Sequence, residues 1–127
     1  MGIPFGPQID IWSVGLVLLE LWTGQPFFVV QSREELYLSL CQKLSPPPRL
    51  RFACGKYTEH LESCSVKSSV KPLNFSLPDH IKLVKRILSK APCTNAPPDL
   101  VHFISLMLHP DPNERLTATE ALQVPRY

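Results

Sequence analysis

The residue types that most often bind metals or act as nucleophiles and bases do not form a reactive set in this chain. It has four cysteines and four histidines. No two cysteines stand in a C-x-x-C pattern, and no two histidines have zinc-ligand spacing. We therefore expect no metal site, and thiols that remain reduced. The four cysteines are Cys41, Cys54, Cys64 and Cys93.

Composition fits one globular domain and excludes several classes of function. Of 127 residues, 44% are hydrophobic and 19% charged, which is enough apolar material for a core. A net charge of +2 is too small to indicate nucleic-acid binding by itself. The apolar segment Ile9–Trp22 contains two acidic residues and is too short for a membrane span. With no signal-peptide pattern at the N-terminus, we expect a cytoplasmic or nuclear protein.

Two helices are predicted in the first third of the chain. Asp10 is a good N-cap for an apolar helix that extends to Trp22, and Gly24 can close that helix in the left-handed conformation. This helix is apolar on nearly every face, so it should lie inside a larger body. The segment Ser32–Glu35 fits a capping box and opens a second helix that runs to Leu44.

Three further helices are expected in the C-terminal half, and no strand is predicted. Pro78 and Asp79 could start a short helix, and Asp99 could cap another. Thr117 and Glu120 fit a second capping box. The helix after Asp99 has an amphipathic stripe at the helical period. That stripe consists of Leu100, Phe103, Ile104, Met107 and Leu108.

Residues 45–98 differ from the rest of the chain and are predicted to be an irregular insert. Eight of the 14 prolines lie there, and periodic patterns are few. The short helix within this zone has an apolar face and a basic one. The basic face is either a solvated surface or a docking or anion-binding surface. It carries Lys82, Lys85, Arg86 and Lys90.

Two segments with their order and spacing resemble one family, the eukaryotic protein kinases. Residues 9–15, Ile-Asp-Ile-Trp-Ser-Val-Gly, resemble the D-x-W-S-x-G helix at the centre of the large kinase lobe. Residues 111–118, Asp-Pro-Asn-Glu-Arg-Leu-Thr-Ala, resemble the closing motif of the same domain. The insert is typical of the group that contains cyclin-dependent, MAP, dual-specificity tyrosine-regulated and homeodomain-interacting kinases. The resemblance implies a mainly α, partial C-terminal lobe over residues 1–127, with 45–98 as its insert.

The resemblance assigns structural roles to four residues of the first motif. Asp10 would hold the backbone of the catalytic loop, in addition to capping its helix. Trp12 and Ser13 would pack near the segment after the activation loop, although Trp12 could equally be an ordinary core residue. Gly15 would allow close helix packing, or it could be a tolerated helix glycine that costs about 1 kcal/mol relative to alanine.

Arg115 is the fifth residue of the family motifs. The resemblance implies a buried ion pair with the glutamate of an A-P-E motif, and no such motif occurs in this chain. Arg115 would then be a buried charge without that partner, which is a costly arrangement. The alternative is a solvated arginine beside Asp111 and Glu114.

The parts that bind nucleotide and transfer phosphate are missing from the 127 residues. The five glycines cannot form G-x-G-x-x-G, no histidine is followed by Arg-Asp, and no aspartate is followed by Phe-Gly. Kinases need these motifs to position the phosphates, the magnesium ions and the base. We expect no catalytic, cofactor-binding or metal-binding residue here, although the full-length family uses ATP and Mg²⁺.

The sequence leaves three hypotheses open. The first is a truncated protein serine/threonine kinase domain, inactive on its own. The second is a non-catalytic, pseudokinase-like module that binds protein partners through the Ser32–Leu44 helix and the 45–98 insert, without nucleic acid or membrane. The third, compatible with either, is a fragment with no stable fold and poor solubility, because its first helix exposes a large apolar patch in isolation.

Overall fold

Five helices form the described part of the chain, which comprises residues 6–44, 75–92 and 95–124 of a computed structural model. No strand occurs in these ranges, so the mainly α prediction is confirmed. Most of the predicted insert, residues 45–74, lies outside them. The helices are α1 (Gln8–Thr23), α2 (Arg33–Lys43), α4 (Leu77–Leu88), α5 (Pro98–Met107) and α6 (Ala118–Gln123).

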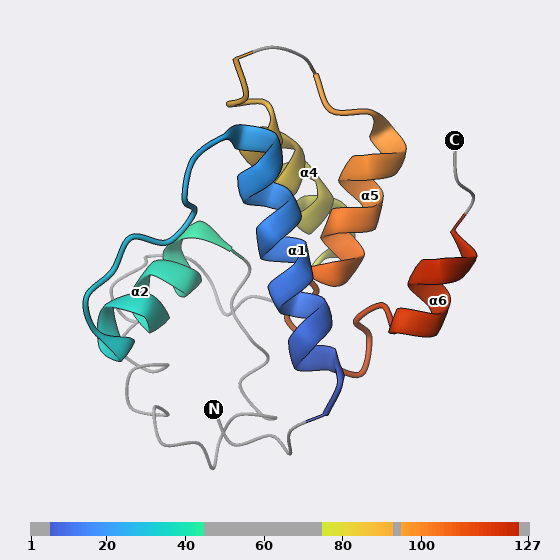
Figure 1. Cartoon of the computed structure of the whole chain (residues 1–127), viewed down its shortest axis with the longest axis horizontal. Helices are drawn as coiled ribbons and strands as arrows, with labels where there is room; N and C mark the ends of the chain where they lie inside the picture. Colours follow the sequence, from blue (N-terminus) through green and yellow to red (C-terminus); the bar gives the residue numbers. More distant parts are fainter. Residues whose placement is uncertain (1–5, 45–74, 93–94, 125–127) are drawn as a thin grey trace.

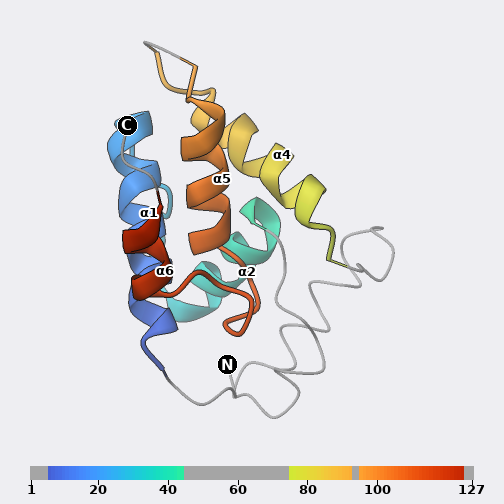
Figure 2. The same cartoon turned by 90° about the vertical axis from the view of Figure 1, so that its right-hand side faces the viewer.

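Helices α1, α4 and α5 pack together around the core, while α2 and α6 lie to either side of α1 (Figure 1). The core is made of aliphatic side chains from these three helices, together with Leu44 at the end of α2. A second view shows α5 between α1 and α4 (Figure 2). Burying one such side chain contributes about 1.5–3 kcal/mol, so the three-helix contact holds the described fold together. The core residues are Leu19, Leu44, Val84, Ile87, Leu88, Val101, Ile104 and Leu108.

The two helices predicted to begin with an aspartate cap have a proline as their N-cap residue instead. Helix α1 starts at Gln8 with Pro7 as its N-cap residue, which already has helical dihedrals, φ −60° and ψ −13°. Helix α5 starts at Pro98, since proline suits a first turn where no N–H is needed. The predicted caps are therefore wrong: Asp10 and Asp99 lie within first turns, where a carboxylate favours the helix dipole.

The other predicted helix ends are largely confirmed. Gly24 closes α1 with φ 72°. Ser32 accepts from the Glu35 N–H at 3.1 Å, but the Glu35 carboxylate accepts from the N–H of Gln31, at 2.9 Å. Only the Ser32 bond of the predicted capping box before α2 is therefore present, and the Glu35 bond goes to a different residue. Helix α4 starts one residue before Pro78, at Leu77.

The capping box before α6 is complete, and we expect it to control that short helix. Thr117 Oγ1 accepts from the Glu120 N–H at 3.2 Å, and the Glu120 carboxylate accepts from the Thr117 N–H at 2.8 Å. These bonds lower the pKa of Glu120. Thr117→Ala should destabilise α6 by about 1 kcal/mol, seen as faster amide hydrogen exchange within Ala118–Gln123. The exposed Thr119→Ala control should change exchange much less; equal effects would contradict the role of the cap.

The predicted stripe of α5 is only partly correct. Ile104, Met107 and Leu108 are buried, whereas Leu100 and Phe103 are half-buried. Val101 and Ser105 are also buried. Because α5 packs against both α1 and α4, its buried surface is wider than the single stripe of a surface helix.

Candidate functional site

Arg115 ties the loop after α5 to the start of α1. Its side chain is buried, at 9% exposure. Its Nε donates to the carbonyl of His109 at 3.0 Å, and its Nη1 donates to the carbonyl of Gln8 at 2.7 Å. The guanidinium also lies 5.0 Å from the centre of the Trp12 ring, within the range of a cation–π interaction. The sequence alternative of a solvated arginine is therefore wrong.

The charge of Arg115 is retained despite its burial. Burial lowers the pKa of Arg115 to about 10, while the nearby Asp111 carboxylate acts in the opposite direction. The guanidinium is therefore protonated at neutral pH. Two carbonyl acceptors and an aromatic face satisfy it, so this arginine stabilises the described fold without the glutamate that the resemblance implies.

Gly15 lies at the contact between α1 and α5. A Cβ atom at this position would lie 2.9 Å from Leu108 Cδ2 and 3.1 Å from Met107 Cβ. Distances this short require a neighbour to move, and Leu108 is fully buried. A glycine here permits the two helices to approach closely.

The structure does not gather all five family-motif residues in one place. Arg115 and Trp12 are in contact, and Gly15 faces α5. Asp10 and Ser13 are exposed on α1; the Ser13 hydroxyl donates to the carbonyl of Ile9 within the same helix, at 3.1 Å. The arrangement links helices and brings no acid, base or nucleophile together.

Two histidines are buried in the structure, although their burial was not predicted from the sequence. His80 is 1% exposed and His109 7% exposed, and their ring centres are 6.3 Å apart. His80 Nε2 lies 3.0 Å from the Ser105 carbonyl, and His109 Nδ1 accepts from the Asp111 N–H at 3.0 Å. A signal existed for His80, because it precedes the buried Val84 and Ile87 at helical spacing.

We expect this histidine pair to make the fold sensitive to acid. Burial is the main cause that lowers the pKa of both residues from the usual 6.5. For His109, Asp111 and Glu114 raise the pKa and Arg115 lowers it. Because the unfolded chain then binds more protons, stability should be full above the unfolded pKa and fall as pH drops below it. Urea unfolding at a series of pH values measures this.

The matched variants are His80→Asn and the exposed His102→Asn. The first should weaken the pH dependence between neutral and mildly acid pH, and the second should leave it unchanged. A stability that is flat across this range in the unaltered chain would contradict the role of the pair.

The described residues offer neither a metal site nor a membrane span. Among them, no group of three or more histidine, cysteine, aspartate or glutamate side chains could hold a metal ion. None of the helices in the described ranges is long and apolar enough to cross a membrane.

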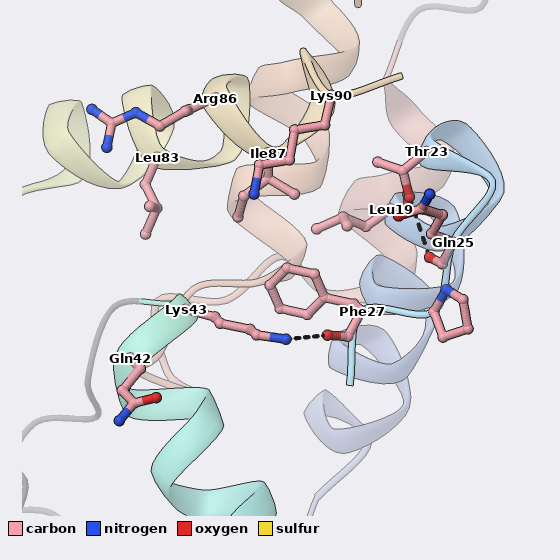
Figure 3. Close-up of a pocket in the computed structure, with 11 residues that line it drawn as sticks. Leu19, Thr23, Gln25, Phe27, Gln42, Lys43, Leu83, Arg86, Ile87 and Lys90 are labelled. Atoms are coloured by element: carbon pink, nitrogen blue, oxygen red, sulfur yellow. Dashed lines mark hydrogen bonds between the residues drawn. The ribbon is translucent and has the colours of Figure 1, made fainter. Parts of the chain in front are cut away.

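A basic pocket is a separate feature of the described residues. It lies between the C-terminal end of α1, the end of α2 and the exposed side of α4 (Figure 3). Its volume is about 390 Å³, within the usual range of ligand-binding clefts. From the sequence, the Ser32–Leu44 helix and the basic residues of the insert were separate candidates, and no signal placed them at one pocket.

Comparisons with known proteins cover nearly the whole chain. The family model of the protein kinase domain matches residues 2–126. The serine/threonine-protein kinase MAK of Rattus norvegicus is 29% identical over 123 residues, which are 97% of this chain and 17% of that protein. A probable cyclin-dependent serine/threonine-protein kinase of Dictyostelium discoideum is 30% identical over 97% of this chain and 17% of its own length.

A third relative is similar to the same extent. The DYRK-family kinase pom1 of Schizosaccharomyces pombe is 29% identical over 97% of this chain and 11% of its own length. The chain thus spans 17% or less of the length of these three curated relatives. No solved structure was found to match it.

Proposed function

Since this chain belongs to the protein kinase domain family, we propose that it forms part of the C-terminal lobe of a serine/threonine kinase. In this proposal its helices are a scaffold, and the groups that bind Mg²⁺ and ATP and transfer phosphate are not among its 127 residues. The relatives named as serine/threonine kinases support the reaction class. The phosphate-binding, metal-binding and base motifs are absent from the sequence, which supports a scaffold role for this chain and a catalytic role for other parts of the kinase domain.

The exposed face of α1 is the observation on which this proposal rests. Val14, Val17 and Leu21 are 46%, 53% and 73% exposed. They follow each other at helical spacing, so they lie on one side of α1, while Gly15 and Leu19 are buried on the other. We call these three residues the apolar row. A scaffold helix that is covered by further kinase structure would carry such a row.

The apolar row should make the isolated chain self-associate. An exposed contiguous apolar surface favours association with any complementary surface. Val17→Glu with Leu21→Glu should convert the oligomer or aggregate to a monomer, because two charges would then have to be buried in the contact. Size-exclusion chromatography with light scattering measures the mass of both forms.

The control carries the same charge change on an exposed helix elsewhere. Thr119→Glu with Gln123→Glu on α6 adds two negative charges and should leave self-association in place. A monomeric unaltered chain with a cooperative melt would show that the row needs no cover, and the scaffold proposal would lose its main support.

A non-catalytic, pseudokinase-like interaction module is the second candidate function. The observation that favours it is the basic pocket between α2 and α4, since both predicted partner surfaces contribute to it. The two candidates differ in one measurable respect: the scaffold role requires the rest of a kinase domain, whereas the module would bind its partner as this chain alone.

A further inference from the structure

The basic pocket has an apolar floor and a cationic rim. Leu19, Leu83 and Ile87 line its interior side, and Phe27 closes one end (Figure 3). The complete lining consists of Leu19, Thr23, Gln25, Pro26, Phe27, Gln42, Lys43, Leu83, Arg86, Ile87 and Lys90. Among these described lining residues, three are basic and none is acidic.

The end of the pocket at Phe27 is held in place by bonds to two helices. The Phe27 N–H donates to Glu20 Oε1 at 2.8 Å, and the Phe27 carbonyl accepts from Lys43 Nζ at 2.8 Å. The Lys43 ammonium also lies 5.3 Å from the centre of the Phe27 ring. The loop between α1 and α2 is therefore fixed before any ligand arrives, which lowers the entropic cost of binding.

The three rim cations come from opposite sides of the pocket. Lys43 reaches in from α2, Arg86 projects from α4, and Lys90 projects from the turn that follows α4 (Figure 3). In that view they do not converge on a single point. A segment with several carboxylates could lie along them.

We propose that this pocket is a docking site for an acidic segment of a protein partner. The segment inserts one apolar side chain against Leu83 and Ile87 and places carboxylates beside Lys43, Arg86 and Lys90. Charge complementarity identifies the occupant, since the rim is cationic and the floor apolar. A purely solvated basic face would not require the fixed Phe27 wall or a cavity of about 390 Å³.

The neighbouring basic residues of α4 supply a matched comparison. Lys82 and Lys85 are exposed on the same helix but do not line the pocket. Lys82 lies 3.9 Å from Asp79, and both side chains are 76% exposed. If the attraction depended only on positive charge, changing Lys82 and Lys85 would reduce the affinity for an acidic peptide as much as changing Arg86 and Lys90.

The test uses the complete chain and a fluorescein-labelled peptide of glutamates that flank a single leucine. Fluorescence anisotropy at moderate salt should show saturable binding. Arg86→Glu with Lys90→Glu should weaken it about ten-fold or more, because two attractions become repulsions. Lys82→Glu with Lys85→Glu, the same charge change outside the pocket, should weaken it much less. A peptide with serine in place of leucine should also bind more weakly.

Three outcomes would overturn the docking proposal. The first is no binding of the peptide by the unaltered chain. The second is an equal loss of affinity in both double variants, and the third is equal affinity for the leucine and serine peptides. Phosphatidylserine vesicles that bind with the same variant dependence, when the peptide does not, would also overturn it in favour of a membrane surface. Because ATP does not enter the measurement and both double variants keep the apolar row, the comparison between them is independent of the scaffold proposal.

Discussion

Arg115→Met should destabilise the chain by about 2–4 kcal/mol, since hydrogen bonds from charged donors contribute about 1.5–3 kcal/mol each. The change leaves the carbonyls of Gln8 and His109 without their donor and removes the cation from the Trp12 ring. Urea unfolding followed by circular dichroism gives the free energy. The Val17→Glu and Leu21→Glu background keeps the sample monomeric for this measurement.

Two further variants show whether the geometry of the guanidinium matters. Arg115→Lys keeps the charge but cannot direct two N–H groups at separate carbonyls in the same planar arrangement, so it should recover only part of the loss. Arg33→Met removes an arginine that is exposed on α2 and should change stability by less than about 0.5 kcal/mol. Equal losses for Arg115→Met and Arg33→Met would contradict the structural role of Arg115.

Leu108→Ala should destabilise the fold by about 2–5 kcal/mol, the range for leucine truncation in a core. Leu108 is fully buried in the cluster that joins α1, α4 and α5. Gly15→Ala should also destabilise, because its new methyl would meet Leu108 Cδ2 and Met107 Cβ. The gain in helix propensity, about 1 kcal/mol, offsets part of that overpacking.

The double variant makes this contact measurable. With Leu108 shortened, the methyl at position 15 enters the space that leucine left. The combined loss for Gly15→Ala and Leu108→Ala should then be smaller than the sum of the single losses, which identifies direct coupling. Additive losses would mean that Gly15 and Leu108 do not pack as the structure shows.

The helices were predictable because local signals specify them. Ser32, Gly24 and the Thr117 capping box marked ends that the structure confirms. Errors occurred where two signals competed: an aspartate cap was expected at Asp10 and Asp99, but the helices start earlier, directly after Pro7 and at Pro98. Proline at a first turn and aspartate at an N-cap are both favourable, and sequence spacing does not decide between them.

The contacts between segments that are distant in the sequence were harder to predict. Family resemblance pointed to Arg115 and Gly15, but the acceptors of Arg115, the carbonyls of Gln8 and His109, are backbone groups that carry no sequence signature. The basic pocket likewise depends on the bonds that hold Phe27 between Glu20 and Lys43. Such positions are set by tertiary packing, whereas helix periodicity reports only which face of one element is apolar.

The most direct test of the scaffold account is transfer of radiolabelled phosphate from Mg·ATP to a basic protein substrate by the purified chain. Its helical circular dichroism spectrum, recorded on the same sample, serves as the control for folding. We expect no incorporation above a reaction without the chain, because the 127 residues lack the phosphate, metal and base motifs. Incorporation that follows the chain through size-exclusion chromatography would contradict it.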